Sequence, residues 1–548
     1  MSALVAALAL SFAVPLAATL VLPLLMLLGC LRAGVRDRMV TWLVLAPVPG
    51  LWAALFAVNQ SLDLPPLLLR LRLSLDLPGA ILLGVAALLW MAAGIYAAGW
   101  LRDDPRRGRI AVWWLLTLTG SLGVFVAADL VSFYLLYSLV SLAAYGLVIE
   151  AATADAQRVG LIYVAFAVVG EALLLIAFVM LAQSAPGDAG MIHAVVAALP
   201  GSRYRVVVPA LLILGFGIKL GMVPFQAWMP VTYRTAPIPA AAVMSGAAVK
   251  AGVIGLIRFL PLGAALPGWG QAMVVLGFVS AFYGALVGLR QSNPRTVLAF
   301  SSISQMGVIV AVFGMGLMTG STAVALAAAF YGAHHTLAKG GLFLGVGLAP
   351  LSGARRGWLV LVPAAIMALG MAGLPLTGGY LAKLAIKPVL GYGLAGVLGV
   401  LSSAATALLM THFLCRVAAL PLVAGVPEPP RVLAWPWLAT ALASVLLPWV
   451  LFAAVPGEDV VDALSPLNLI EAALPVAVGV VLGLGWRRWG GFLLRDQAIV
   501  LPVSSTVARS TLSVGAAIER VDAAARLWPV ATASLLALVL ALAALMWG

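Results

Sequence analysis

Apolar runs of about 20 residues recur from one end of the sequence to the other, and this pattern limits the fold more than any other feature. A run of that length can cross the hydrocarbon core of a bilayer as one helix. The chain is 64% hydrophobic and only 9% charged, which is far more apolar than a water-soluble domain requires. The runs are continuous rather than alternating, which argues against an outer-membrane barrel. The sequence therefore predicts an all-α protein with about 14–16 transmembrane helices.

The arginines predict how these helices are oriented. Sixteen apolar runs begin near residues 3, 39, 78, 110, 131, 158, 206, 237, 268, 295, 321, 358, 390, 433, 467 and 528. The five lysines lie within the runs; the other 26 basic residues are arginines, and 21 of them fall in loops after odd-numbered runs. Because basic loops stay in the cytoplasm, both termini are expected on the periplasmic side of a bacterial inner membrane. The net charge of +13 thus reflects membrane orientation, and no nucleic-acid partner is expected. The first run has no basic residues before it and is expected to be a retained helix.

The stretch from Gly215 to Leu260 predicts a helix that breaks inside the membrane. Lys219 precedes Gly221 and Pro224, and Lys250 follows in the next apolar run. An ionisable side chain at membrane depth is costly and usually marks an ion or proton path. The backbone groups that a break releases must face protein or a cavity, which indicates a functional site.

Four apolar runs carry a titratable residue at one depth. Each such residue lies 13 positions into its run, about 20 Å of helical rise and past the centre of a hydrocarbon core roughly 30 Å thick. The four residues are Glu171, Lys219, Lys250 and His334. Structural ion pairs need not share a depth, so this row favours a path in the plane of the membrane.

The eleventh and twelfth runs add further titratable residues. His335 and Lys339 are four residues apart and so share a helix face, with His334 one position away. The twelfth run is interrupted by one proline and two glycines before Lys383. The two interrupted runs, the seventh and the twelfth, are five runs apart, which is typical of two related five-helix units.

These observations predict a division of the chain into four parts. Residues 1–109 hold the first three helices, 110–265 and 266–420 hold the two five-helix repeats, and 421–548 hold the C-terminal helices. Residues 503–527 are less apolar and contain charged side chains. They are expected to form either a short surface helix on the cytoplasmic side or a solvated connector.

Five segments together resemble one protein family: GFGIKLGMVPFQAWMP, SGAAVKAGVIGLIRF, SNPRTVLAFSSISQMG, HHTLAKGGLFLG and GLPLTGGYLAK. The family comprises the antiporter-like subunits of respiratory complex I, Mrp-type cation/proton antiporters and membrane-bound hydrogenases. The resemblance implies fourteen core helices, inverted five-helix repeats, and a proton path along the membrane midplane. The path residues that it implies are Lys219, Lys250, His334 or His335, Lys339 and Lys383.

One departure from the family concerns the partner of Lys219. The family usually has a glutamate in its fifth helix, within a Trp-Glu pair, whereas the run FYLLYSLVSLAAYGLV has Tyr137 and Ser138 in that place. Some family members carry an acidic residue one helix later, and Glu171 in VVGEALLL fits that position. We therefore predict that Glu171 replaces the missing glutamate as the counter-charge of Lys219.

Each of these residues also has a structural interpretation. A buried lysine can belong to a structural ion pair, and a buried histidine can be a satisfied core residue. Desolvation makes a buried lysine easier to deprotonate, which a proton relay needs. Lys387 is expected to extend its amine toward the outer face. The sequence shows no phosphate loop, cysteine cluster or flavin motif, so we expect no cofactor, no metal site and no redox chemistry in the chain itself.

Three classes of function remain compatible with the sequence. The first is a proton-translocating subunit, with sodium as the alternative ion, of a complex I-like, hydrogenase-like or Mrp-like membrane complex. The second is the membrane subunit of an energy-coupled uptake system for inorganic carbon or another ion. The third is a membrane scaffold whose path has decayed, as Ser138 in place of a glutamate would allow. In the first two classes the partners are other subunits, the lipid bilayer and the transported ion.

Overall fold

The structure is a computed structural model that describes residues 2–63, 71–151, 153–185, 190–353, 357–423, 429–455, 457 and 459–489. All of them lie in one compact part of the chain, Met1–Phe492. The surface helix expected at 503–527 and the apolar run near 528 lie outside the described residues.

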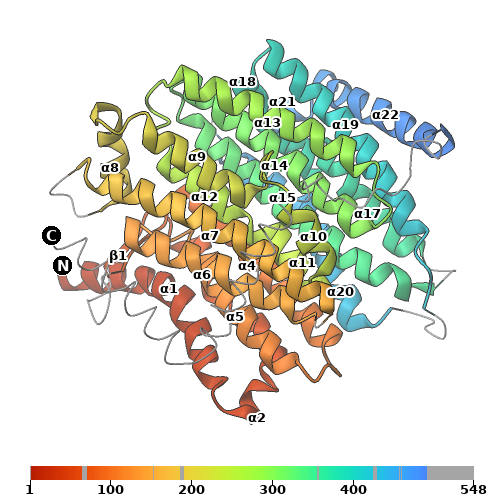
Figure 1. Cartoon of the computed structure of the whole chain (residues 1–548), viewed down its shortest axis with the longest axis horizontal. Helices are drawn as coiled ribbons and strands as arrows, with labels where there is room; N and C mark the ends of the chain where they lie inside the picture. The colour runs from red at the N-terminus through yellow and green to blue at the C-terminus, as the bar shows by residue number, and fades with distance from the viewer. Residues whose placement is uncertain are drawn as a thin grey trace, which may run out of the picture. The chain divides into compact units, whose positions relative to one another are not determined.

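Helices running side by side make up almost all of this compact part (Figure 1). The first elements are α1 (Ser2–Gly29), α2 (Ala33–Arg36), η1 (Met39–Thr41), η2 (Leu43–Leu45), α3 (Val48–Phe56), β1 (Ser61–Asp63), β2 (Arg72–Ser74) and α4 (Leu77–Trp100). The next are α5 (Arg107–Gly123), α6 (Leu130–Ile149), α7 (Ala154–Ala182), α8 (Ile192–Ala198), η3 (Leu199–Gly201), α9 (Val207–Leu220), α10 (Trp228–Thr235), α11 (Ile238–Val243), η4 (Met244–Ala248) and α12 (Lys250–Phe259). The remaining elements are α13 (Pro267–Gly288), α14 (Pro294–Thr319), α15 (Ala323–Leu348), η5 (Ala349–Leu351), α17 (Trp358–Ala372), α18 (Gly378–Leu390), α19 (Leu394–Ala418), α20 (Arg431–Phe452), α21 (Val460–Ala463) and α22 (Pro466–Trp489).

The helices agree closely with the predicted runs. Within the described residues, nine helices are long and apolar enough to cross a membrane. The shorter apolar helices include α9 and α17, which are the parts before the two predicted breaks. The second run, expected from near residue 39, is less regular than predicted, because Leu43–Phe56 is bent by 65° relative to the preceding helical segment Ala33–Thr41. Among the described residues the only paired strands are β1 and β2, which form an antiparallel hairpin with Leu62 opposite Leu73.

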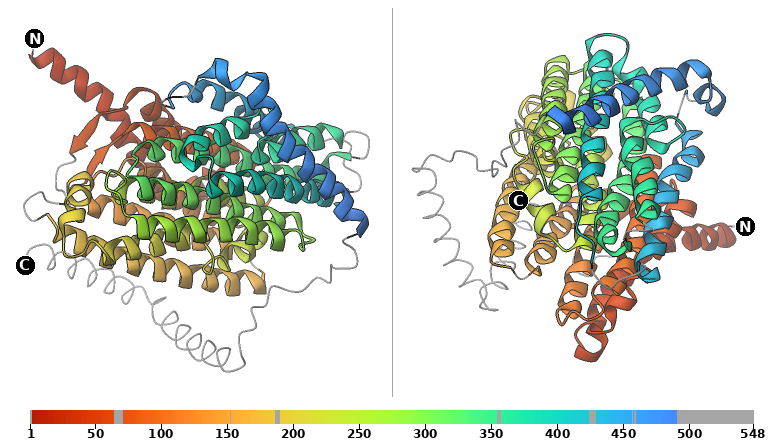
Figure 2. Two further views of the ribbon diagram at one scale, coloured as in Figure 1. Left: turned by 90° about the horizontal axis from the view of Figure 1, so that it is seen from above. Right: turned by 90° about the vertical axis from the view of Figure 1, so that its right-hand side faces the viewer.

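The same order of helix packing occurs twice, once in each of two five-helix units. In the first five-helix unit α5 packs on α6, α6 on α7, α7 on the broken helix α9, and α9 on α12. In the second unit α13 packs on α14, α14 on α15, α15 on the broken pair α17 and α18, and α17 on α19. The two broken helices therefore occupy corresponding places. Helix α22, drawn in blue in Figure 2, lies outside both units and packs on α19.

Contacts between loops fall into two groups that match the predicted alternation. Arg106 Nη1, in the third loop, donates a hydrogen bond of 2.6 Å to the carbonyl of Glu150 in the fifth. Asp129, in the fourth loop, forms a β-bridge with Met191 in the sixth. Two backbone hydrogen bonds follow the same rule. The Val423 amide, in the thirteenth loop, donates to the Pro350 carbonyl in the eleventh, and the Leu266 amide, in the eighth loop, donates to the Leu317 carbonyl beside the tenth. We call the side of the odd-numbered loops the arginine-rich face and the opposite side the arginine-poor face.

Asp129 organises the arginine-poor end of α6. Its Oδ1 accepts hydrogen bonds from the backbone amides of Val131 and Ser132 at 3.0 and 2.9 Å, as an N-terminal helix cap does. Its Oδ2 accepts from the amide of Arg72 at 3.1 Å and from the Ser132 hydroxyl at 2.5 Å. One carboxylate thus fixes the start of α6 and ties it to the β-hairpin.

Helices α13 and α14 touch backbone to backbone. Glycines recur every seven residues on both helices, at Gly270, Gly277 and Gly284 on α13 and at Gly307 and Gly314 on α14. A Cβ atom added to Gly277 would lie 2.5 Å from a backbone nitrogen of α14, and one added to Gly307 would lie 2.5 Å from the Gly277 carbonyl oxygen. Small residues permit such close approach between membrane helices.

Candidate functional site

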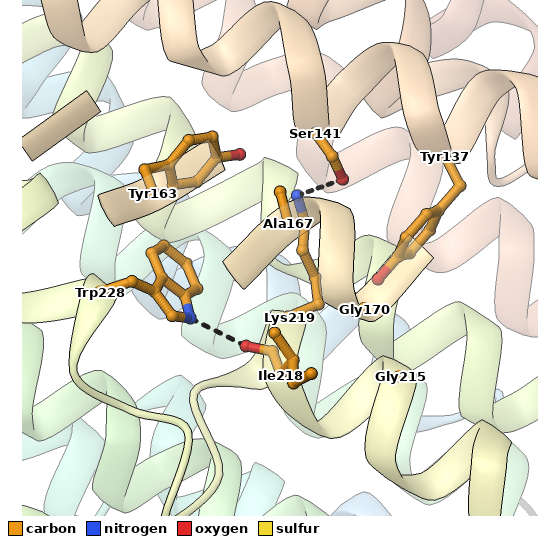
Figure 3. A pocket seen from close by; sticks show the side chains of 9 residues that line it. All are labelled: Tyr137, Ser141, Tyr163, Ala167, Gly170, Gly215, Ile218, Lys219 and Trp228. Carbon is orange, nitrogen blue, oxygen red and sulfur yellow. Dashed lines mark hydrogen bonds between the residues drawn. The ribbon is translucent and has the colours of Figure 1, made fainter. Parts of the chain in front are cut away.

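The first broken helix ends where the sequence predicts. Helix α9 ends at Leu220, and Gly221 takes a left-handed conformation with φ of 69°, which glycine adopts without steric cost. The indole Nε1 of Trp228, after the break, donates a hydrogen bond of 2.9 Å to the Ile218 carbonyl (Figure 3). This bond satisfies a carbonyl near the helix end, as a helix terminus inside a membrane requires.

Lys219 points into a small cavity next to this break (Figure 3). Its Nζ donates a hydrogen bond of 2.9 Å to Ser141 Oγ on α6, and it lies 5.7 Å from the ring centroid of Tyr137 and 6.0 Å from that of Tyr163. Aromatic faces at this distance attract a cation. The cavity of about 10 Å³ has room for roughly one water molecule.

Glu171 lies close to Lys219 without forming a direct ion pair. The carboxylate is 7% exposed, lies beside the hydroxyls of Ser138 and Ser141, and interacts electrostatically with Lys219. Its Oε1 atom has no hydrogen-bond partner in the described part of the chain. Ser141 therefore contacts the lysine and also lies beside the glutamate, which is the arrangement that a bridging hydroxyl requires.

The other buried carboxylates lie at helix ends. Among the described residues, the buried acidic side chains are Asp129, Glu150 and Glu171. Asp129 caps the start of α6, and Glu150 follows its last residue and pairs with Arg109 at 3.1 Å. Glu171 is therefore the one of the three that lies within a helix at the depth of Lys219.

Lys250 and His335 are in direct contact between the two units. The distance from Lys250 Nζ to His335 Nδ1 is 2.8 Å, and Lys250 Nζ also donates a hydrogen bond of 2.9 Å to the Gly246 carbonyl. Gly246 lies in the π-helical turn η4, which ends two residues before Lys250. Such turns are frequent at functional sites. The exposed fractions of Lys250 and His335 are 0% and 1%.

Lys339 shares a helix face with His335, but its hydrogen bond goes to another helix. Although Lys339 is one helical turn from His335, its Nζ donates a hydrogen bond of 2.7 Å to the Leu298 carbonyl of α14. Lys339 is fully buried and interacts electrostatically with Lys250 and His335. The helix face is shared as expected, but α14 determines where the amine lies.

His334 and Lys383 lie at the second break. The His334 imidazole packs against Gly378 and Gly379 at the start of α18, where added Cβ atoms would lie 2.9 and 2.7 Å from its ring nitrogens. The ring interacts electrostatically with Lys383 and with the Ser444 backbone, but neither ring nitrogen meets hydrogen-bond geometry with any described group. Lys383 Nζ donates a hydrogen bond of 2.8 Å to the Ser403 hydroxyl of α19.

Sequence reasoning missed the hydroxyl partners of Lys219, just before the first break, and of Lys383, just after the second. Ser141 binds Lys219 and Ser403 binds Lys383, although each serine is far from its lysine in the sequence. A further buried polar chain joins three helices: Tyr331 donates to Gln305 at 2.6 Å, and Gln305 donates to Thr406 at 3.0 Å. The available signal was polar residues within apolar runs, which usually hydrogen-bond between membrane helices.

The described residues contain no group of three His, Cys, Asp or Glu side chains that could hold a metal ion. What the arrangement offers is a set of groups that bind and release protons: amines, imidazoles, one carboxylate and hydroxyls. Lys250 and His335 are in contact, Glu171 lies near Lys219, and His334 lies near Lys383. Links between these clusters are longer than a hydrogen bond.

Comparison with known sequences identifies the family. A family model described as "NADH:quinone oxidoreductase/Mrp antiporter, TM" matches residues 127–411. The chain belongs to this family. Its matched part holds both broken helices and all seven predicted path residues, which confirms the resemblance that the sequence motifs indicated.

Relatives from this family are subunits of different systems. The chain is 29% identical over 290 residues to hydrogenase-4 component B of Escherichia coli, covering 50% of this chain and 43% of that protein. It is 30% identical over 318 residues to Na(+)/H(+) antiporter subunit A1 of Staphylococcus haemolyticus, covering 53% of this chain and 39% of that protein. The chain therefore spans less than half of the length of these curated relatives.

Solved structures share the fold. A chain of the Mrp complex from a Dietzia species superposes with a TM-score of 0.76 at 23% identity, covering 97% of this chain and 62% of that one. A chain of an archaeal membrane-bound sulfane sulfur reductase gives a TM-score of 0.65 at 20% identity, covering 86% and 99%. With the family match over residues 127–411, the chain is a multi-pass membrane protein with the fold of antiporter-like subunits.

Proposed function

We propose that this chain translocates protons along the plane of a bacterial inner membrane, as one subunit of a larger membrane complex. The path runs from Lys219 with Glu171, through Lys250, His335 and Lys339, to His334 and Lys383. This order follows the two broken helices and the contact between the five-helix units. With the arginine-rich face in the cytoplasm, both termini lie on the periplasmic side.

The observation that carries this proposal is the contact between Lys250 and His335. Two basic groups lie 2.8 Å apart with almost no solvent exposure. Burying an uncompensated charge costs several kcal/mol, so two cationic groups cannot stably coexist there. A single hydrogen bond between an amine and an imidazole instead lets one proton reside on either nitrogen. A proton arriving from either unit can therefore be passed to the other.

Nitrogen donors also favour protons over sodium as the ion of this path. Hard cations such as Ca²⁺ and Mg²⁺ are bound by several oxygen atoms, and we apply the same preference to Na⁺. The path contains lysine amines and imidazoles, with Glu171 as its one carboxylate. Amines and imidazoles carry protons readily, and cationic lysines repel a metal cation.

The relatives support the assignment to a complex. Their names describe a hydrogenase component, an antiporter subunit, an Mrp complex and a respiratory membrane complex. In each case an antiporter-like chain is one part of an assembly. We therefore propose other membrane subunits as partners, with any redox chemistry located in them.

Proton uptake by vesicles that contain the purified complex tests the proposal. Lys219→Ala should abolish proton-coupled activity while the protein remains inserted, because the first unit then lacks its proton-binding amine. Arg431→Ala, which removes an exposed cation at the start of α20, is the matched control and should pump normally. Wild-type pumping by Lys219→Ala would refute the proposal.

A further inference from the structure

An ion pair joins the second broken helix to α22, the helix outside both five-helix units. Lys387 Nζ lies 2.6 Å from Glu471 Oε2, and the side chains are 38% and 50% exposed. Lys387 is in the last turn of α18, and Glu471 is in the second turn of α22. Both positions are near the arginine-poor face, because α18 ends there and α22 begins there. The pair is therefore partly exposed near the arginine-poor face, where α18 ends.

Lys383 lies one helical turn before this pair. Residues four apart on a helix are neighbours, with about 5–6 Å between their Cβ atoms, and like charges at this spacing repel each other. Lys383 is held at its other side by Ser403 rather than by a carboxylate. The electrostatic repulsion that Lys383 experiences from the surface side therefore depends on whether Lys387 is paired with Glu471.

We propose that Lys387 and Glu471 form the gate at which protons leave Lys383 for the arginine-poor face; this inference rests on the proposed function. With the pair closed, the Glu471 carboxylate offsets the charge of Lys387, and Lys383 keeps its proton. When α22 moves away from α18, the unpaired Lys387 ammonium repels the proton on Lys383. The Lys383 N–H bond then breaks, the proton leaves through water, and Lys383 remains as a neutral amine. The freed Glu471 carboxylate accepts the proton as an O–H group and releases it to bulk water.

The surroundings leave few other groups to set this charge. From α15, His334 interacts electrostatically with Lys383. Before α22, Asp462 accepts a hydrogen bond of 3.2 Å from the Asn468 side chain. Helix α17 has no charged residue, and the charged residues of α14, α19 and α20 lie near their arginine-rich ends. Tyr380 of α18 donates a hydrogen bond to the Ala463 carbonyl of α21, and Asp459 caps α21. Within the described chain, the titratable groups around Lys383 on this side are thus Lys387, Glu471, His334, Tyr380, Asp459 and Asp462.

The position of Glu471 argues against a role in fastening alone. Solvent-exposed ion pairs contribute little to stability, and α22 already packs along α19 through apolar side chains. A lysine and a glutamate at this place can change the electrostatic repulsion at Lys383, which two apolar residues could not do.

Proton release from vesicles that contain the intact complex tests the gate, with pH varied on the release side. Lys387→Met should slow release by roughly tenfold and move the pH optimum upward by about one unit, because Lys383 then holds its proton more firmly. Glu471→Gln should move the optimum downward, because Lys387 is then always unpaired. Val481→Ala, an exposed apolar change on α22, is the matched control and should behave as wild type.

A double variant separates gating from fastening. Lys387→Met with Glu471→Met restores an apolar contact but no charge, so it should stay as slow as Lys387→Met. Wild-type rate and pH profile in this double variant would overturn the gate, as would equal shifts in both single variants. Lys219→Ala is measured in the same preparations: if it still pumps, the proposed function fails, whereas if it alone is inactive, only the gate fails.

Discussion

Lys250 Nζ and His335 Nδ1 lie 2.8 Å apart, and they join α12 of the first five-helix unit to α15 of the second. Each is the direct side-chain partner of the other, because the second bond of Lys250 goes to a backbone carbonyl and His335 Nε2 has no partner in the described chain. Removing either side chain therefore breaks the one hydrogen bond that joins two path side chains within the described residues.

The first prediction is that Lys250 and His335 act as one functional unit. Lys250→Met and His335→Gln should each lower proton translocation by at least about tenfold, and the double variant should be no slower, since residues that act together are not additive. Proton uptake by reconstituted vesicles measures all three rates. Additive losses in the double variant would show that the two groups act independently.

The second prediction concerns Glu171 as the counter-charge of Lys219. Glu171→Gln should slow translocation, because the neutral amide no longer favours the protonated lysine. Adding Ser138→Glu to that variant should restore part of the rate, since Ser138 lies beside Glu171 at the place where the family usually has its glutamate. Asp155→Asn, an exposed change at the start of the same helix, serves as the control. Full activity of Glu171→Gln would remove Glu171 from the path.

The third prediction is that His334 reduces stability in order to serve transport. A buried polar group without a good hydrogen bond costs about 1–3 kcal/mol, and neither ring nitrogen of His334 meets hydrogen-bond geometry with a described group, although the Ser444 backbone lies beside the ring. His334→Leu should therefore raise the unfolding temperature in detergent and abolish or strongly slow proton translocation. If the variant were instead less stable and fully active, His334 would be a packing residue.

The fourth prediction concerns the cap of α6. Asp129→Ala should lower the free energy of unfolding by about 1–2 kcal/mol, because it removes a helix cap that also holds the hairpin strand at Arg72. Asp129→Asn keeps a capping oxygen and should lose less. Thermal unfolding followed by circular dichroism compares the two variants with wild type. Equal losses would show that the negative charge, rather than the cap, is what matters.

Much of the fold was predictable because it depends on local sequence. Hydropathy alone located the helices, since each crossing needs its own apolar run. The break after Lys219 was visible because Gly221 and the following proline are both poor helix residues. The bend near the start of the second run was not predicted, because Arg36, Asp37 and Arg38 make Ala33–Thr41 resemble a charged loop rather than part of a span.

The site was predictable only where one helix carries the information. The titratable residues could be found because charge is rare in apolar runs, whereas their partners lie on other helices. Ser141 and Ser403 gave no local sign that they would bind Lys219 and Lys383. The direction taken by Lys339 likewise depends on a backbone carbonyl of α14, which no pattern within α15 contains.

The glycine contact between α13 and α14 limits how the second unit can move. Side chains at most helix interfaces can repack as the helices slide, but here backbone atoms meet directly, so sliding by even one residue would bring larger side chains into the same gap. The two helices must therefore shift together, as a rigid strut. Movement that accompanies the arrival of a proton at Lys383 is therefore expected in the elements that pack on this strut at the two breaks, which are α10 and α18.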